Sequence, residues 1–231
     1  QKWWQFLRTR GELQAAIGML GRVIGIPRGT QWVGFTFLPS RVVFSDKVVA
    51  CPFESEDLFC VLSSRCHEVW GRFFSSTLED RVNYAPTDCF ETFPFPAGVL
   101  EHATVCPSTT DHGPLTTDNP QLTTLETAGR EYYAFSAALM VRNNEGLTKT
   151  YNRFHDPHET SPDILKLREL HAAMDRAVLE AYGWHDLAET ATCEFLLDYE
   201  DEETSVVSSQ WSVAGTTDDE QLTTDFRQLT T

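Results

Sequence analysis

The chain has no apolar run of membrane-spanning length, and its N-terminus has no charged-then-apolar secretory pattern. We therefore expect no membrane association and a cytoplasmic location. Cys-x-x-Cys pairs are also absent, and the six cysteines are irregularly spaced. This spacing disfavours a structural zinc site, which uses closely paired ligands, and favours reduced, mostly buried thiols. The alternative is a zinc site built from Cys51, Cys60, Cys66 and His67.

Positive charge is scarce, since 18 Lys and Arg residues face 34 Asp and Glu residues, for a net charge of −16. The imbalance is mostly a property of the C-terminus, where residues 186–231 carry 12 acidic groups and one arginine. Residues 1–81 instead carry 10 basic and 8 acidic groups. Because nucleic acids are bound largely through cations, this weakly basic region argues against tight autonomous binding to DNA.

The motifs that carry catalysis are missing as well. The sequence has no Asn/Asp-Pro-Pro-aromatic motif, no glycine-rich F-x-G-x-G loop and no P-D-x(n)-E-x-K nuclease motif. A metal site in the cluster His155 to Glu159 is disfavoured, because Pro157 separates the two histidines and no helix holds them on one face. We expect no catalytic residue, no bound cofactor and no metal ligand in this chain.

The residues that are present indicate a packed globular region, with 41% hydrophobic and 12% aromatic residues. Residues 21–29, 31–39 and 41–53 predict three or four strands, with a hairpin turn at 45–47. A helix is expected to follow Ser55, with its apolar face at Leu58, Val61, Leu62, Val69 and Phe73. The prediction is an α+β fold, in which a small mixed or antiparallel sheet with packed helices precedes a helical C-terminal segment.

The clearest helix signal lies at 161–183. Ser161 can cap the helix, Pro162 suits its first position, and Gly183 suits its end. One apolar stripe follows at alternating spacings of three and four, formed by Ile164, Leu167, His171, Met174, Val178 and Ala181. Residues 126–140 predict another helix, whereas residues 151–155 show no helical pattern.

Two segments repeat the short polar words LTT and TTD, at 103–125 and 216–231. Their composition cannot bury a core, so we expect a low-complexity loop and an acidic, disordered tail. The predicted organisation is therefore an α/β domain at 1–98, an insertion at 99–125, a helical segment at 126–200 and the tail at 201–231.

Three stretches resemble parts of one protein family. The sequences are SRCHEVWGRFF at 64–74, RVNYAPTDCFETFPFP at 81–96, and the run from Tyr151-Asn152 to the AYGW that ends at Trp184. In this order they resemble the end of the target-recognition domain and the C-terminal element of type IIG restriction–modification, adenine-specific DNA methyltransferases. The resemblance implies double-stranded DNA as the partner. It also implies S-adenosylmethionine and an upstream methyltransferase domain in a longer parent protein, and the start at Gln1 fits a piece of such a protein.

The resemblance implies DNA-binding residues of two kinds. The cations expected on strands and loops are Arg8, Arg10, Arg28, Arg41 and Lys47, of which Arg28 is the best candidate because it occupies a loop at a strand end. The second cluster is Tyr151, Asn152, Arg153 and His155. Solvated surface charge is the alternative for the first set, and a structural turn that anchors the following helix is the alternative for the second.

We therefore expect a DNA sequence-recognition module whose catalytic domain lies elsewhere. Two alternatives stay open at this stage. One is a non-functional remnant of a disrupted methyltransferase gene, and the other is a protein-interaction module of a phage-defence complex.

Overall fold

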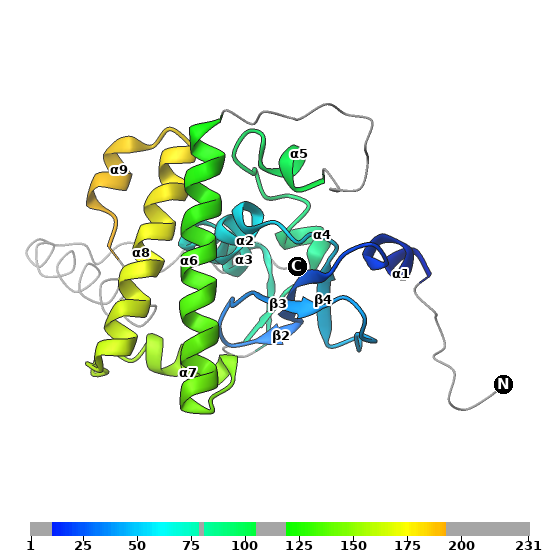
Figure 1. Cartoon of the computed structure of the whole chain (residues 1–231), viewed down its shortest axis with the longest axis horizontal. Coiled ribbons are helices and arrows are strands. Elements are labelled where there is room, and N and C mark those ends of the chain that lie inside the picture. The colour runs from blue at the N-terminus through cyan, green and yellow to red at the C-terminus, as the bar shows by residue number, and fades with distance from the viewer. Residues whose placement is uncertain (1–10, 79–80, 105–118, 193–231) are drawn as a thin grey trace, which may run out of the picture. The chain divides into compact units, whose positions relative to one another are not determined.

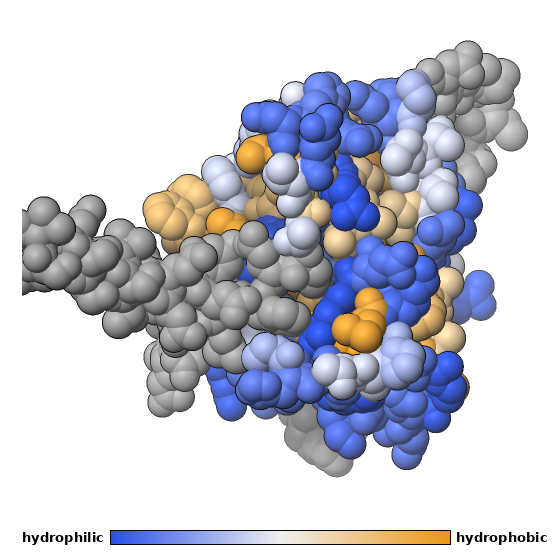
Figure 2. All heavy atoms as spheres, turned by 90° about the vertical axis from the view of Figure 1, so that its left-hand side faces the viewer, coloured by the Kyte–Doolittle hydropathy of each residue, from blue (hydrophilic) through white to orange (hydrophobic). Residues whose placement is uncertain are grey.

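A computed structural model describes residues 11–78, 81–104 and 119–192, all within one compact unit. Two small antiparallel sheets lie beside a layer of helices, in which the long helices α6 and α8 run alongside each other (Figure 1). The predicted α+β class is confirmed. No helix of the described ranges is long and apolar enough to cross a membrane. The face shown in Figure 2 is largely hydrophilic, with apolar side chains in small separate groups.

The first sheet is built around β1 (Arg22–Pro27), which pairs antiparallel with β3 (Thr36–Pro39) and β4 (Val48–Cys51). The second sheet has the order β2 (Gly29–Thr30), β6 (Arg81–Asn83), β5 (Ser76–Leu78). The predicted turn at 45–47 exists, but it does not join two paired strands. It leads into β4, and both β3 and β4 pair with β1 instead of with each other.

The helix expected after Ser55 is in fact two helices, α2 (Glu56–Ser63) and α3 (Arg65–Phe74). Ser64 interrupts them with an extended backbone, and its hydroxyl donates to the carbonyl oxygen of Val61 at 2.7 Å. A serine that bonds to nearby backbone in this way competes with the helix. The break turns a different face of α3 inward, so Val69 and Phe73, predicted to be apolar core positions, are 50% and 81% exposed.

Helix α6 (Pro120–Asn143) begins six residues before the expected start at 126. The side chain of Asn119 accepts from the backbone N–H of Gln121 at 3.0 Å, and Pro120 occupies the first helical turn. Leu122 and Leu125 are buried, which gives this added turn a place in the core. The predicted loop at 99–125 is therefore wrong at both ends, since α5 (Val99–Thr104) precedes α6. The repeat words at 109–118 lie outside the described residues, as does the tail.

Helix α8 (Pro162–Ala181) confirms the predicted stripe, because Ile164, Leu167, His171, Met174 and Val178 are all buried. The helix ends at Gly183, which has a left-handed φ of 78°. Ser161 occupies the N-cap position without a side-chain capping bond. The remaining helices are α1 (Gly11–Ile17), α4 (Pro86–Cys89), α7 (Leu147–Phe154) and α9 (His185–Thr190).

Helix α7 corrects the expectation that residues 151–155 are not helical, since they form its last turn and its cap. The helix has only eight residues, and short helices depend on tertiary packing more than on their own propensity. That packing comes from side chains distant in sequence.

One continuous core joins the sheet to the helices, and it crosses the boundary expected near residue 98. Leu58 and Phe59 of α2 belong to the same buried cluster as Leu125 and Tyr132 of α6. The two helices approach closely at Gly129, where an added Cβ would lie 2.3 Å from the carbonyl oxygen of Glu56. The sheet is therefore supported from the helical side.

Candidate nucleic-acid interface

The two sheets meet at Arg28. Its backbone N–H donates to the carbonyl oxygen of Lys47 at 2.7 Å, and its own carbonyl oxygen accepts from the N–H of Tyr84 at the same distance. The backbone of Arg28 is thus fixed on both sides. Its side chain is exposed, and so is that of Lys47. Two cations therefore stand next to each other at a strand end, where the sequence placed the best DNA-binding candidate.

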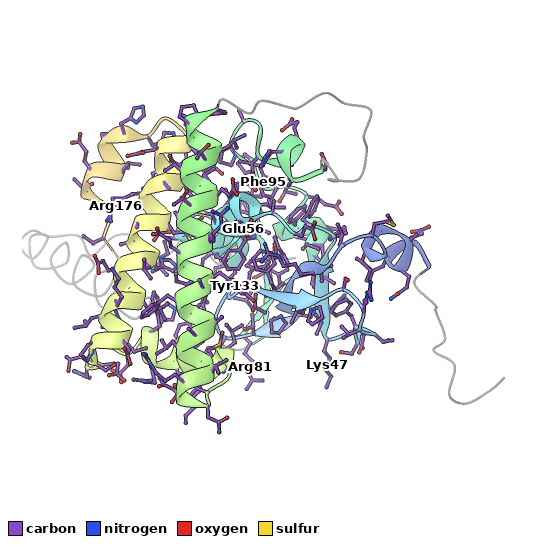
Figure 3. All side chains as sticks on the ribbon, viewed as in Figure 1. Lys47, Glu56, Arg81, Phe95, Tyr133 and Arg176 are labelled. Carbon is purple, nitrogen blue, oxygen red and sulfur yellow. The ribbon has the colours of Figure 1, made fainter. Side chains whose placement is uncertain are left out.

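Arg41 is also exposed, in the turn that follows β3, whereas Arg8 and Arg10 lie outside the described residues. Sequence reasoning missed Arg81, the first residue of β6. The strand shows an exposed–buried–exposed pattern over Arg81, Val82 and Asn83, and this alternation could have identified the outward arginine. In Figure 3 the side chains of Lys47 and Arg81 project from the same side of the molecule.

These four exposed cations differ from the other described Lys and Arg residues in how they are paired. Arg28, Arg41, Lys47 and Arg81 make no ion pair with any residue that the structure describes. Eight others form ion pairs with carboxylates: Arg22, Arg65, Arg72, Arg130, Arg142, Lys149, Arg153 and Lys166. Arg168 and Arg176 donate to backbone carbonyls. Among the described residues, the cations without an ion pair are therefore concentrated on the sheets and their loops.

The second predicted cluster has a different environment. Tyr151 is buried, and its hydroxyl lies 3.1 Å from that of Tyr132. Burial raises the pKa of Tyr151 to about 12. The side-chain oxygen of Asn152 accepts a hydrogen bond from the indole N–H of Trp32 at 2.6 Å. Both side chains are therefore engaged with other parts of the protein.

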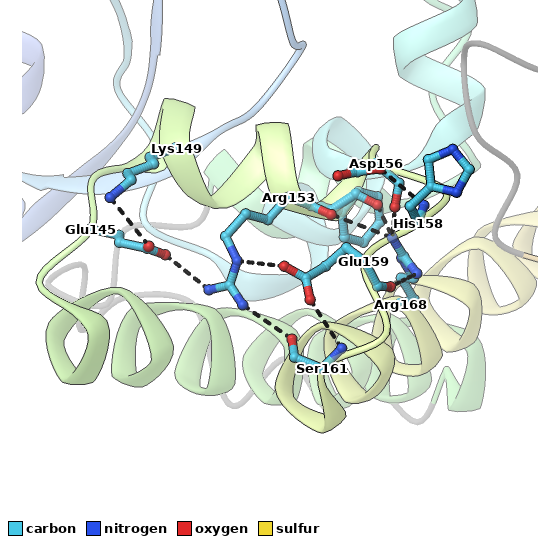
Figure 4. A network of polar contacts seen from close by, with 9 residues as sticks. Glu145, Lys149, Arg153, Asp156, His158, Glu159, Ser161 and Arg168 are labelled. Atoms are coloured by element: carbon cyan, nitrogen blue, oxygen red, sulfur yellow. Dashed lines mark hydrogen bonds and ion pairs between the residues drawn. The ribbon is translucent and has the colours of Figure 1, made fainter.

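Arg153 is compensated by two carboxylates, Glu145 at 3.1 Å and Glu159 at 2.9 Å (Figure 4). It also donates to the hydroxyl of Ser161 at 3.1 Å. The hydrogen bond from Arg153, with those from Ser161, lowers the pKa of Glu159 to about 2. This arginine ties α7 to the start of α8 and presents little free charge.

His155 is buried and its ring stacks on Trp32, with ring centroids 4.0 Å apart and an angle of 13° between the planes. Burial, together with nearby arginines, lowers the pKa of His155 to about 3, so the ring is neutral at pH 7. Trp32 is thus held by both Asn152 and His155. Sequence reasoning did not identify Trp32, because no local pattern links a residue in the β2–β3 loop to α7.

The loop after α7 is organised by Arg168 of α8. Its guanidinium donates to four backbone carbonyl oxygens, those of Phe154, Glu159, Arg153 and Asp156, at 2.6–3.3 Å (Figure 4). Arg153 and Phe154 belong to the last turn of α7, whose carbonyls lack intrahelical partners, and Asp156 and Glu159 belong to the loop that follows. Arg168 therefore fixes the backbone that carries Arg153 and His155.

The described parts of the chain contain no group of His, Cys, Asp or Glu side chains that could hold a metal ion. Cys51, Cys60, Cys66 and Cys89 are free thiols. Burial raises the pKa of Cys51 and Cys66 to about 12, which makes both poor nucleophiles at pH 7.

Comparison with known proteins gives two findings. Residues 4–97 match the family model described as MmeI, target recognition domain. A solved structure of the type IIL restriction–modification enzyme MmeI in complex with DNA is similar to this chain at 23% sequence identity, with a TM-score of 0.49. That match covers 71% of this chain and 19% of the enzyme chain. No curated protein matches the sequence.

Proposed function

We propose, from the match of residues 4–97 to the MmeI target recognition domain model, that this chain selects a DNA sequence for a restriction–modification enzyme. The family match supports the target-recognition domain expected from the motifs at 64–74 and 81–96. Selection would use the sheet and its loops, where the described cations without ion pairs lie. Double-stranded DNA is the ligand.

The observation that carries this proposal is that the exposed cations of the sheets and their loops lack carboxylate partners in the described part of the chain, whereas most other described cations are ion-paired. A phosphate must displace whatever already neutralises a cation, so arginines in ion pairs with Glu or Asp are poor DNA ligands. Arg28, Lys47 and Arg81 have no carboxylate partner to exchange within the described part of the chain. Their clustering also reconciles a net charge of −16 with DNA binding, because binding depends on the local field of the contacting surface.

The cations differ in what they can read. An arginine can bind guanine O6 and N7 with two hydrogen bonds, whereas a lysine acts as a point charge suited to phosphate. The backbone of Arg28 is fixed on both sides, which suits it to base contact in the major groove. Lys47 beside it is suited to the DNA backbone.

Methyl transfer would belong to a separate methyltransferase domain that uses S-adenosylmethionine. The residues of this chain do not fit that cofactor, because the sequence holds neither the glycine-rich loop nor the Asn-Pro-Pro-aromatic motif. The role of this chain is therefore to bind and orient DNA.

The proposal is tested by fluorescence anisotropy of the 231-residue chain with a labelled random-sequence duplex of about 20 bp, titrated at several salt concentrations. Lys47→Ala and Arg81→Ala should each weaken binding by about tenfold. Each should also reduce the slope of log K against log salt by about 0.9 for every phosphate that the variant no longer neutralises. Arg142→Ala is the control, because Arg142 is ion-paired with Asp163 at 2.7 Å. Absence of binding by the wild-type chain, or an equal weakening with Arg142→Ala, would refute the proposal.

A further inference from the structure

Trp32 lies in the segment 28–35, which carries Arg28 and passes through β2; this segment is called the recognition loop below. Its backbone is held locally by two hydrogen bonds. The hydroxyl of Thr30 donates to the carbonyl oxygen of Trp32 at 2.7 Å, and the N–H of Gly34 donates to the same oxygen at 2.9 Å. These bonds shape the loop, but they do not fix it to the rest of the molecule.

The sheets attach the start of the loop, through the backbone of Arg28 and the pairing of β2 with β6. The helices attach the part around Trp32. Asn152 accepts from the Trp32 indole, and His155 stacks on the ring. From α3, Arg72 donates to the carbonyl oxygen of Gln31 at 2.9 Å, and its guanidinium carbon lies 6.0 Å from the centre of the indole ring. The loop is therefore clamped by side chains that follow it by 40 to 123 residues in the sequence.

A second contact, between Tyr151 and Gly34, also holds the loop against α7. The ring of Tyr151 lies against Gly34, where an added Cβ would meet three ring atoms at 3.0–3.3 Å. Tyr151 is itself buried and bonded to Tyr132 of α6. The loop thus rests on a side chain that α6 holds in place.

We propose that the helical segment 147–155 positions the recognition loop for DNA, with Asn152 and His155 acting as positioning residues through Trp32. This inference rests on the proposed DNA-binding function. It gives residues 151–155 a role different from the direct DNA contact expected from the sequence. The recognition surface is then incomplete without α7, although α7 lies outside residues 4–97 of the family match.

The geometry favours positioning over direct contact. The Asn152 side-chain oxygen is already accepting from Trp32, and the His155 ring is buried and stacked. Arg153, the charged member of the cluster, is neutralised by Glu145 and Glu159. A contribution from this cluster to DNA binding therefore passes through the loop that it holds.

Two substitutions at one position separate the two roles. Asn152→Asp keeps an oxygen acceptor for the indole N–H but adds a negative charge that would repel a contacted phosphate. Asn152→Leu removes the acceptor and adds no charge. Thr148→Leu, at an exposed position of the same helix, is the control. All are made in the 231-residue chain, and intact folding is checked by circular dichroism.

Two measurements are made on each variant. The first is hydrogen exchange of the amides of residues 28–35 in the free protein, and the second is the affinity for the same random duplex at about 150 mM NaCl. Asn152→Leu should speed exchange and weaken binding by roughly fivefold, the effect of removing one hydrogen bond. Asn152→Asp and Thr148→Leu should stay within about twofold of wild type on both measurements.

A double-mutant cycle completes the test. Trp32→Phe removes the indole donor, so adding Asn152→Leu to it should not weaken DNA binding further. The inference is overturned if Asn152→Leu weakens binding without faster exchange in 28–35, if Asn152→Asp binds as weakly as Asn152→Leu, or if Asn152→Leu changes neither quantity. Failure of the wild-type chain to bind duplex would refute the proposed function, and this inference with it.

Discussion

Two buried histidines are held in their neutral form. His67 is fully buried, and its Nε2 lies 2.9 Å from the hydroxyl of Tyr84. Burial lowers the pKa of His67 to about 3, and the same cause acts on His155. Both rings lie beside aromatic side chains that support the recognition loop. Protonation of either ring would place a charge in that packing.

The stability of the protein should therefore fall as the pH drops from 6.5 towards 3. Below the unfolded pKa of 6.5 these histidines take up protons in the unfolded chain but not in the folded one, at a cost of about 1.4 kcal/mol per pH unit for each group. Urea unfolding at about pH 6 and about pH 5 measures this slope. His155→Phe, which keeps an aromatic ring on Trp32, should reduce the slope by about half. An unchanged slope would contradict the assignment of His155 as a neutral group.

His171 should behave in the opposite way. Burial lowers its pKa, but the Asp175 carboxylate at 3.0 Å outweighs burial, and the pKa is raised above 6.5. Its contribution to stability is thus fully present below pH 6.5 and is lost as the pH rises through the folded pKa. NMR titration of His171 checks the direction, with His171→Gln as the control for assignment. A folded pKa below 6.5 would contradict this account.

The sequence predicted the environment of a residue well where it depends on neighbouring positions in the chain. It predicted the environment poorly where it depends on contacts with residues distant in the sequence. Arg28 was expected in a loop at a strand end and Lys47 in a turn, and the structure places both there as exposed residues. Whether they contact DNA stays a prediction. The role of Trp32 could not be derived, because its partners Asn152 and His155 follow it by 120 residues or more.

At the scale of elements, α6 and α2 are joined through the glycine at their crossing. Gly129→Ala should destabilise the protein by about 2 kcal/mol, because the new methyl group would overlap the carbonyl oxygen of Glu56 and press on Cys60. Within a helix, alanine is normally more stabilising than glycine. A loss of stability on Gly129→Ala would therefore show that α6 and α2 are in close contact at this position. Gly11→Ala, in open space at the start of α1, should be neutral or slightly stabilising. Chemical denaturation compares the two variants.

Arg168 holds the loop between α7 and α8 through its four carbonyl contacts. Arg168→Met should cost about 2–4 kcal/mol, because four charge-assisted hydrogen bonds to backbone carbonyl oxygens would be lost. Arg176→Met is the matched control. Arg176 makes one such bond, to Ala191 at 3.2 Å, and its removal should cost under about 1 kcal/mol. Equal decreases of stability in both variants would contradict the anchoring role of Arg168.

Elements were predictable from the sequence where their signals are local. Helix α8 carries its own proline start, apolar stripe and glycine end. Helix α7 buries Thr150, Tyr151 and Phe154 on one face, but eight residues are too few to identify a helix from that spacing alone. Its position is fixed by contacts with Trp32 and Arg168. The break at Ser64 depends on one hydroxyl–carbonyl bond, which spacing alone could not distinguish from a continuing helix.

At the scale of the whole molecule, the sheet and the helices share one core. A fragment of residues 1–98 should therefore fail to fold cooperatively, because Leu58 and Phe59 would be without the cover of α6. A fragment of residues 1–192 should melt as a single transition close to that of the full chain. Circular dichroism melts of both fragments test this, and a cooperative transition in 1–98 would contradict it.

The shared core also sets how the specificity of such a protein can be inherited or engineered. A crossover that exchanges only the strands would replace Gly34 and Trp32 by residues of another loop. The side chains of Tyr151 and Asn152, which fit Gly34 and Trp32 here, would then face residues that they do not fit. Grafts cut at residue 98 should therefore fail to fold, and so should not acquire the DNA sequence preference of the donor protein. Grafts that carry the whole block from β1 through α8, with Arg72 of α3 included, keep the contacts that hold Trp32 and Gly34. The smallest transferable unit of recognition is then the block from the sheet through α8.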